Sequence, residues 1–498
     1  MIKKPHLSRL VVAATALAVL GGGAVSAHPA PGAVSAPSAQ GAPNGPWAPG
    51  APNAPSAQGA PNSRLAPDAV SAHAVDGTPQ PSYVPGEVVV GYSAPALAGR
   101  IERSTRLTAA WSPAPGVDVL RLPHRESVPS ALARLRGIRG VAYAVPDYLA
   151  HIASPWIPND TGRANQPRGW ERMQWNFLPG TGIDAPDAWG NLIADGRPGG
   201  RGVIVAVLDT GAAYRNWGRF AKSPDFTGTR FVDPYDFVAG NAFPLDREGH
   251  GTFVAGEIAE ATNNDFALTG LAYGATIMPV RVLAASGSGD AATIARGIRY
   301  AVSHGARIIN LSLEFGIDIK PSGIPEVLSA IHYAYARGAL IVGAAGNDEA
   351  GQIAYPARAA GAVAVGATTR DRCLGWYSNV GPSLALVAPG GGDDASLPGD
   401  PNCFPARVLP PIRQLTFANP YHPDPRRFGY PDIYYGTSMA AAEVSGAAAL
   451  VIASGVIGRH PTPAEVLKRL EQTATPLGGT VPNREYGYGL IDAAAATS

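Results

Sequence analysis

The chain has 498 residues, of which 15% are charged, and its formal net charge at pH 7 is +1. This balance gives no electrostatic basis for binding nucleic acid or an anionic membrane surface, so we expect neither partner. The length exceeds one average domain and predicts two or three units, whose limits follow from the uneven spread of 60 Gly and 48 Pro residues.

Residues 1–27 have the pattern of a secretory signal peptide. Lys3, Lys4 and Arg9 precede an apolar stretch over 10–20, and the small residues at 25–27 suit cleavage. The apolar stretch is too short and too rich in Ala to span a membrane stably, which disfavours the alternative of an uncleaved anchor. We therefore expect a secreted protein with no stable membrane anchor. Separately, we expect the protein to be a monomer.

Residues 28–81 are predicted to form a disordered linker. They are mostly Ala, Pro, Gly, Ser, Asn and Gln, and one eight-residue string occurs at 37–44 and again at 55–62. Such a composition buries too little apolar area to offset the entropy of the chain.

Residues 82–150 are predicted to form a small α+β unit. Strand patterns occur at 84–92, 117–122 and 141–145, and 127–135 is apolar at helical spacing. Alternation of strands and a helix within about seventy residues is typical of an α+β fold. A small independent binding module is the alternative interpretation.

Residues 151–498 are predicted to form the main domain. The best helical patterns are at 290–304, 325–337 and 438–453. Strand-like runs lie at 203–208, 277–283, 307–311, 340–345 and 362–367. Continuous apolar strands separated by helices predict a parallel sheet buried on both faces, with functional residues beyond the carboxyl ends of its strands. The Pro-rich segment 393–434 is predicted to be a surface excursion.

The chain has two cysteines, Cys373 and Cys403, both in the main domain. Export would permit a disulfide between them. Two separate buried thiols remain the alternative, because spacing along the chain does not establish distance.

Three motifs carry residues suited to nucleophilic catalysis. Asp209 ends a buried-strand pattern in Asp-Thr-Gly, His250 opens a helical pattern in Gly-His-Gly-Thr, and Ser438 stands in Gly-Thr-Ser-Met-Ala. A serine at a helix start suits a nucleophile, since free N–H groups and the positive end of the helix dipole lie where an oxyanion would form. The order Asp, His, Ser is one of three known orders for one geometry.

With these motifs the chain resembles the subtilisin-like serine proteases from Gln174 to its end, including Gly-Tyr-Gly-Leu-Ile at 487–491. The resemblance implies a doubly wound parallel α/β sheet with helices on both faces, preceded by a small α+β, ferredoxin-like prodomain. It implies a secreted serine endopeptidase, made as a zymogen, that cleaves proteins or peptides through Asp209, His250, Ser438 and an acyl-enzyme. The strings at 85–90 and 141–148 resemble inhibitory propeptides, so 82–150 would be an intramolecular inhibitor.

The same resemblance implies further site residues. Asn347, after a strand in Gly-Asn, would donate its side-chain amide to the oxyanion. The substrate pocket would be formed by Ser312, Leu313, Glu314, Ala345 and Gly346. Glu314 stands where the family usually has Gly. Together with Asp348 it would favour basic or amide-rich substrate residues, or else it would point into solvent at the rim of the cleft, the interpretation we favour.

The loop at 261–270 resembles the calcium loop of subtilisins. The implied Ca²⁺ ligands are Gln174, Asp225 and Asn264 with the carbonyls of Thr262, Phe266 and Leu268. A plain polar loop is the alternative. A second acidic group, at positions 236, 246 and 248, is explained equally well by solvated charges, and we assign it no role.

Two positions depart from the family pattern. Ala442 stands where Pro is usual, and Glu443 stands where His is common. We expect the missing ring to shift Ser438 Oγ and to alter acyl-enzyme hydrolysis. Two other functions stay open: a protease-like scaffold without turnover, and an acyl-transferring or ester-cleaving enzyme, which Ala442 permits.

Overall fold

The computed structural model describes residues 83–148, 155–163 and 165–498. The predicted signal peptide and linker lie outside these residues. We describe residues 83–148, the N-terminal unit, and residues from 155 onward, the larger unit, separately.

The N-terminal unit is a four-stranded antiparallel sheet with two helices. Its strands are β1 (Tyr83–Tyr92), β2 (Thr108–Ala114), β3 (Val117–Arg121) and β4 (Val141–Tyr148), in the order β2-β3-β1-β4, and its helices are α1 (Ala98–Thr105) and α2 (Val128–Arg136). Apolar residues of β1, β3, α1 and α2 form its core. The predicted α+β fold is confirmed. The sequence patterns missed α1 and β2, because β2 is largely exposed and carries no alternating apolar face.

The larger unit is built on a parallel sheet. Its strands are β5 (Ile204–Asp209), β6 (Arg230–Phe231), β7 (Tyr235–Asp236), β8 (Thr276–Arg281), β9 (Ile308–Leu311), β10 (Leu340–Ala344), β11 (Ala362–Thr368) and β12 (Leu384–Pro389). The order is β12-β11-β10-β9-β5-β8-β6, with β7 beside β8. All pairs in this sheet are parallel, as predicted.

Helices cover both faces of this sheet. They are α3 (Ala185–Ala194), α4 (His250–Ala259), α5 (Ala291–Ser303), α6 (Pro325–Ala336), α7 (Thr437–Ser454), α8 (Pro463–Thr473) and α9 (Ala493–Thr497). Val205 and Val207 belong to the core that contains α3, α4 and α7, whereas Ala206 and Leu208 pack with α5 and α6. The alternation follows from the two-residue period of a strand. The doubly wound α/β fold is therefore confirmed.

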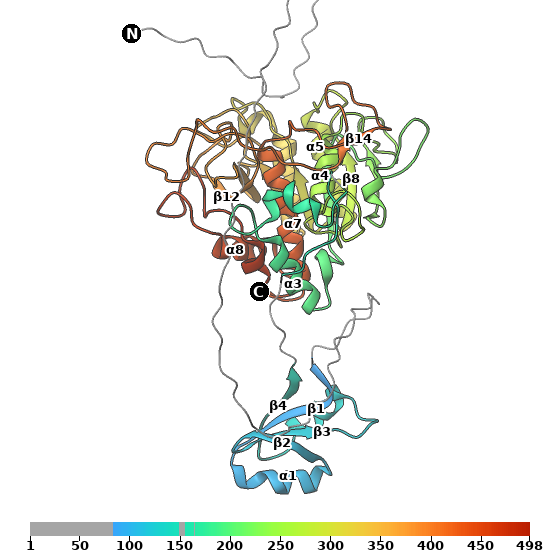
Figure 1. The fold of residues 1–498 in the computed structure, drawn as a ribbon, viewed down its shortest axis with the longest axis vertical. Helices are drawn as coiled ribbons and strands as arrows, with labels where there is room; N and C mark the ends of the chain where they lie inside the picture. The colour runs from blue at the N-terminus through green and yellow to red at the C-terminus, as the bar shows by residue number, and fades with distance from the viewer. Residues whose placement is uncertain (1–82, 149–154, 164) are drawn as a thin grey trace, which may run out of the picture. The chain divides into compact units, whose positions relative to one another are not determined.

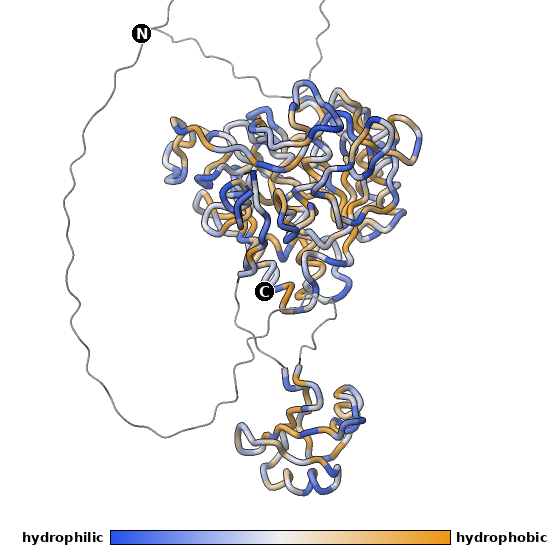
Figure 2. Tube along the Cα trace, turned by 45° about the vertical axis from the view of Figure 1, so that its right-hand side comes forward, coloured by the Kyte–Doolittle hydropathy of each residue, from blue (hydrophilic) through white to orange (hydrophobic). Residues whose placement is uncertain are grey.

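Helix α7 runs through the middle of the larger unit (red in Figure 1) and is buried on all sides along most of its length. Among the described residues it is the one helix long and apolar enough to cross a membrane, and 83% of it is buried inside the fold. Hydrophobic stretches, orange in Figure 2, likewise run through the interior of the larger unit. Helix α7 is thus a core helix.

The segment 393–434 is only partly the surface excursion that the sequence predicted. It contains a short hairpin, β13 (Thr416–Phe417) with β14 (Phe428–Gly429), and Ile412, Gln414 and Phe417 are buried. Ile412 packs with Phe253 of α4 and Met439 of α7. These contacts could not be predicted from the Pro-rich sequence of 393–434, because single buried residues between turns leave no periodic pattern.

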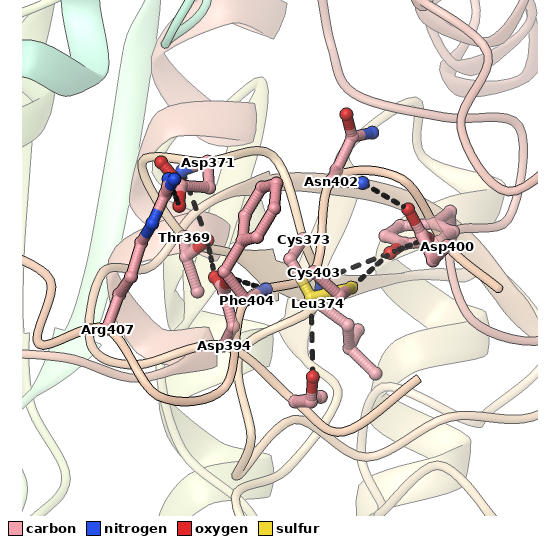
Figure 3. The surroundings of a disulfide bond; sticks show 12 residues. Thr369, Asp371, Cys373, Leu374, Asp394, Asp400, Asn402, Cys403, Phe404 and Arg407 are labelled. Carbon is pink, nitrogen blue, oxygen red and sulfur yellow. Dashed lines mark hydrogen bonds and ion pairs between the residues drawn. A yellow bond between two sulfur atoms is a disulfide. The ribbon is translucent and has the colours of Figure 1, made fainter. Parts of the chain in front are cut away.

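Cys373 and Cys403 form a disulfide (Figure 3), which decides between the two alternatives left open. Their Cα atoms are 4.9 Å apart and 30 positions separate them. Asp394, inside the closed loop, accepts hydrogen bonds from Thr369 Oγ1 (2.5 Å) and from the N–H of Phe404 (2.7 Å). Closing a loop of this length stabilises the folded chain by about 3.6 kcal/mol in the chain-entropy model.

Two carboxyl groups meet in the core between α4 and α7. Glu257 and Glu443 are both buried, and Asn176 Nδ2 donates to Oε1 of Glu443 (2.8 Å) and of Glu257 (3.5 Å). The Oε2 atoms of both groups have no hydrogen-bond partner among the described residues. Burial raises the pKa of both carboxyls well above the usual range, and the proximity of the second carboxyl adds to the rise at Glu443.

We expect Glu443→Gln to flatten the fall in stability at rising pH. A carboxyl whose pKa is higher in the folded than in the unfolded chain costs no stability below the unfolded pKa, about 4.3. Between that pH and the folded pKa it lowers the free energy of unfolding by about 1.4 kcal/mol per pH unit. Unfolding by denaturant at several pH values would measure the slope. Glu326→Gln, at a half-buried position in the first turn of α6, is the control and should keep the parent slope. Glu443→Gln would also keep the parent slope if both buried carboxyls were ionised throughout.

Candidate active site

Asp209 is placed at the carboxyl end of the central strand β5 by a tightly packed turn. Gly211 has φ 113°, and a Cβ there would lie 2.6 Å from the carbonyl oxygen of Pro244. A Cβ on Gly251 would lie 2.2 Å from the carbonyl oxygen of Gly211 and 3.1 Å from Asp209 Oδ1. The glycines of Asp-Thr-Gly and Gly-His-Gly-Thr are therefore required for these two segments to touch.

A buried carboxylate, Asp246, ties the same segments together. It accepts hydrogen bonds from Thr210 Oγ1 (2.9 Å) and from the N–H (2.9 Å) and Oγ1 (2.6 Å) of Thr252. Thr210 Oγ1 in turn accepts the N–H of Gly251 (2.9 Å). The two threonines of the motifs thus orient the start of α4 against the end of β5.

His250 is the first residue of α4 and faces Asp209. Its Nδ1 lies 2.8 Å from Oδ1 and 3.0 Å from Oδ2 of Asp209, whose side chain is fully buried. An ionised carboxylate only accepts, so Nδ1 carries the proton and Nε2 is free to accept one. The His250 side chain is 21% exposed, which leaves one edge of the ring open.

Neighbouring carboxylates favour the protonated form of His250. Burial favours the neutral ring, but the charge of Asp209 and its hydrogen bond, followed by the charges of Glu248 and Asp246, outweigh burial and raise the pKa of His250 to about 9. Above this pKa the ring is neutral, with its proton on Nδ1 beside Asp209 and with Nε2 open as a base.

Ser438 lies in the first turn of α7, and its neighbours hold that turn in place. Its carbonyl accepts a hydrogen bond from Ser312 Oγ (2.7 Å), and its own Oγ lies 3.3 Å from the carbonyl of Ser312. Asn347 Oδ1 accepts the N–H (2.9 Å) and Oγ1–H (3.1 Å) of Thr437, the residue before Ser438. The end of β10 is thereby joined to the start of α7.

His250, Ser438 and Asn347 line one cavity, although they come from three segments of the chain. Its other lining residues are Glu248, Tyr377, Pro420, Tyr421, Ile433, Tyr434, Tyr435, Gly436 and Met439. The tyrosines among these residues, most of which belong to 420–435, form what we call the aromatic wall. None of the three motifs indicates it. The ring of Tyr434 lies 4.4 Å from that of Phe253 on α4, which fixes the wall against the helix of His250.

The five predicted substrate-binding residues lie on two adjacent segments, one after β9 and one after β10, but none of them lines this cavity. Ser312, Leu313, Ala345 and Gly346 are buried. Glu314 is half-buried and hydrogen-bonded to Asn347, so the interpretation we favoured, a carboxylate turned to solvent, is wrong. Glu314 reaches Asn347 because β9 and β10 pair in a register that places the two following segments side by side. The pattern of one strand alone does not show this register.

The structure brings together most of the predicted calcium ligands. Asp225 Oδ1 accepts Asn264 Nδ2–H (2.8 Å), and its Oδ2 accepts the N–H of Leu268 (3.1 Å). Gln174 Oε1 instead accepts the N–H of Thr269 (2.9 Å), one residue further on. Thr262 and Phe266 lie in the same loop, in which residues 263, 265 and 267 have the positive φ of the left-handed region. Among the described residues, no three His, Cys, Asp or Glu side chains gather as a metal site.

Other residues around the site could be recognised only in the fold. Asp246 and Glu248 were seen as an acidic group without a role, yet Asp246 organises both motifs and Glu248 Oε2 accepts the N–H of His250 (2.6 Å). Asp236, the third member, pairs with Arg281 at 2.9 Å. The signal available in the sequence was that Asp246 and Glu248 stand four and two residues before His250.

Comparison with known proteins identifies both units. Residues 200–489 match the subtilase family, and residues 69–147 match the fervidolysin N-terminal prodomain. The second match begins before residue 82, where we placed the start of this unit.

Individual relatives agree with these families. Subtilisin Savinase of Lederbergia lenta is 38% identical over 302 residues, which cover 60% of this chain and 91% of that protein. The thermophilic serine proteinase of Bacillus sp. (strain AK1) is 31% identical over 413 residues, covering 82% of this chain and 86% of that protein. A solved protease structure from Pseudoalteromonas arctica PAMC 21717 matches with a TM-score of 0.54 and 28% identity, over 68% of this chain and 98% of its own. The chain is a subtilisin-type serine endopeptidase that belongs to the subtilase family and carries an N-terminal prodomain.

Proposed function

We propose that this chain hydrolyses peptide bonds through Asp209, His250 and Ser438, with an acyl-enzyme on Ser438. The observation that carries the proposal is the pairing of His250 Nδ1 with the buried Asp209, while His250 and Ser438 open into the same cavity. These contacts are the ones that the histidine of a Ser-His-Asp triad makes. Such a triad is recognised by its geometry and not by the positions of its residues in the sequence.

The steps follow from the groups present. Ser438 Oγ attacks the peptide carbonyl while His250 Nε2 takes its proton and later passes it to the leaving amine. Asp209 keeps His250 in the tautomer with Nδ1–H and stabilises the imidazolium. Water then hydrolyses the ester on Ser438, with His250 again as the base.

Charge on the tetrahedral intermediate is stabilised at the start of α7. The N–H of Ser438 and the side-chain amide of Asn347 are the proposed oxyanion donors, and Asn347 is tied to Thr437 by two hydrogen bonds. Donors held rigidly before the reaction cost no reorganisation when charge develops.

The N-terminal unit is proposed to be an intramolecular inhibitor, which makes the full chain a zymogen. The prodomain match at 69–147 supports this role. We propose the division into a signal peptide at 1–27, a linker at 28–81, a propeptide at 82–150 and a catalytic domain at 151–498. The N-terminal signal pattern supports secretion of the mature enzyme.

We also propose a structural Ca²⁺ ion at the loop of Asp225 and Asn264. Asp225 is fully buried, and burial raises the pKa of its carboxyl to about 8, so the site favours either a proton or a cation there. One carboxylate with amide and carbonyl oxygens is a donor set that suits Ca²⁺. To serve as a ligand, Asn264 would present Oδ1, which accepts the N–H of Phe266 (3.0 Å).

Removal of calcium is therefore expected to lower Tm. An ion present at 100 times its Kd stabilises the folded state by about 2.7 kcal/mol. Differential scanning calorimetry with calcium and with EDTA measures the effect, and Asp225→Asn should abolish the difference. Asp265→Asn, an exposed carboxyl in the same loop, should retain it. Equal Tm values for the parent under both conditions would exclude the ion.

The proposed function is tested by expressing the full chain, letting it mature, and labelling the mature enzyme with a fluorophosphonate, which reacts with activated serines, while casein hydrolysis is followed. We expect one phosphonylated peptide, containing Ser438, and loss of casein hydrolysis in proportion to labelling. Casein hydrolysis that survives complete labelling, or a label on another serine, would contradict the proposal.

A further inference from the structure

Glu314 and Asn347 are brought together by the pairing of β9 with β10. Leu311 lies beside Gly343 in the parallel register, so the segments that follow leave the sheet side by side. Three residues further on, Glu314 Oε2 accepts the backbone N–H of Asn347 (3.0 Å), and Oε1 accepts its Nδ2–H (3.4 Å). The carboxyl group thus contacts both donors of one residue.

Asn347 is held from the opposite side as well. Its Oδ1 accepts the N–H and the hydroxyl of Thr437, next to Ser438. A Cβ on Gly346 would lie 2.4 Å from Glu314 Oε2 and 2.1 Å from Asn379 Nδ2, so the carboxyl packs directly over this glycine. The side-chain amide of Asn347 is therefore fixed between Glu314 and the start of α7.

The charge of Glu314 is poised to change near neutral pH. Burial, and then the charge of Asp348, raise its pKa to about 7, although the N–H groups of Asn347 favour the anion. The neighbouring segments carry one exposed carboxyl, one neutral amide and one arginine. Asp318 is exposed on the same loop, Asn379 is neutral, and Arg358 stacks over Tyr355, whose carbonyl accepts the N–H of Phe315. Across Ser438 the titratable groups that line the cavity include His250 and Glu248, whose Oε2 accepts the N–H of His250.

We propose that Glu314 is a positioning residue for Asn347, and that its charge sets how strongly Asn347 stabilises the oxyanion. This inference rests on the proposed function of Asn347. When neutral, Glu314 holds the amide in place at no electrostatic cost. When ionised, it engages Nδ2–H more strongly and places a negative charge beside the oxyanion, which weakens stabilisation of the transition state.

The test measures kcat of Glu314→Gln and of the parent on one peptide substrate at each pH. The quantity of interest is the quotient of the variant's kcat over the parent's kcat. The titration of His250 is present in both enzymes and largely cancels in this quotient. Loss of an oxyanion donor costs about 10²–10³-fold in kcat, so a weakened donor should raise the quotient about tenfold between about pH 6 and about pH 9. The rise should centre near 7, where Glu314 ionises.

Two further variants separate positioning from other roles. Asp348→Asn removes the charge that disfavours ionised Glu314, so Glu314 should ionise at lower pH. The kcat of this variant relative to the parent should therefore dip just below the pH at which Glu314 ionises in the parent and recover at higher pH. Asp318→Asn, an exposed carboxyl on the same loop, should superimpose on the parent. The Asp348 variant keeps the test available should Glu314→Gln fail to fold.

A quotient that stays constant with pH overturns the inference. So does a change confined to KM for substrates with Lys or Arg, which would assign Glu314 to substrate selection. A parent without activity at any pH overturns the proposed function and this inference together. An active parent with a flat quotient overturns this inference alone.

Discussion

Replacing Ser438 with alanine is expected to lower kcat for peptide hydrolysis about 10⁶-fold, the loss typical when a triad serine is removed. The reason is that no other hydroxyl in the first turn of α7 opens into the cavity with His250. The remaining rate would come from binding and from the oxyanion donors, about 10³–10⁴-fold over water.

The same variant should also remain a zymogen. We expect the parent chain to be trimmed between Asp147 and Gln174, and the Ser438→Ala chain to stay full-length, as followed by mass spectrometry over time. Ser303→Ala, an exposed serine of α5, is the matched control and should mature normally. If the Ser438→Ala chain trims itself or digests casein, Ser438 is not the nucleophile.

Asp209→Asn is expected to lower kcat about 10⁴-fold without unfolding the protein. Asparagine would offer an N–H to His250 Nδ1, which drives the proton to Nε2 and leaves His250 unable to accept the proton of Ser438. The buried site keeps its shape because the two side chains have nearly the same volume. Steady-state kinetics and Tm would be measured together, with Asp195→Asn at the exposed end of α3 as control.

This variant should also move the pH dependence of kcat/KM. In the parent, activity rises as His250 loses its proton, with a midpoint near the pKa of about 9. Asp209 supplies the largest of the effects that raise this pKa, so removing its charge should shift the midpoint to lower pH. An unchanged midpoint, or a kcat within tenfold of the parent, would exclude the assigned role of Asp209.

Strong local patterns allowed much of the fold to be predicted. Runs such as 203–208 and 340–345 are apolar throughout because both faces of their strands are buried, and the structure places strands β5 and β10 there. Thr416–Phe417 and β2 could not be predicted in the same way. Their burial or exposure depends on which distant residues cover them, and no period in the sequence records this.

The sequence by itself determined the fold class, the order Asp209, His250, Ser438 and the glycines that let these segments meet. These features are local, since a backbone turn or helix start depends on a few neighbouring residues. Only the tertiary structure decided that Glu314 holds Asn347, that Glu257 faces Glu443, and that Cys373 bonds Cys403. Each is a contact between segments far apart in the chain, and its geometry arises from strand register and helix packing rather than from any local pattern.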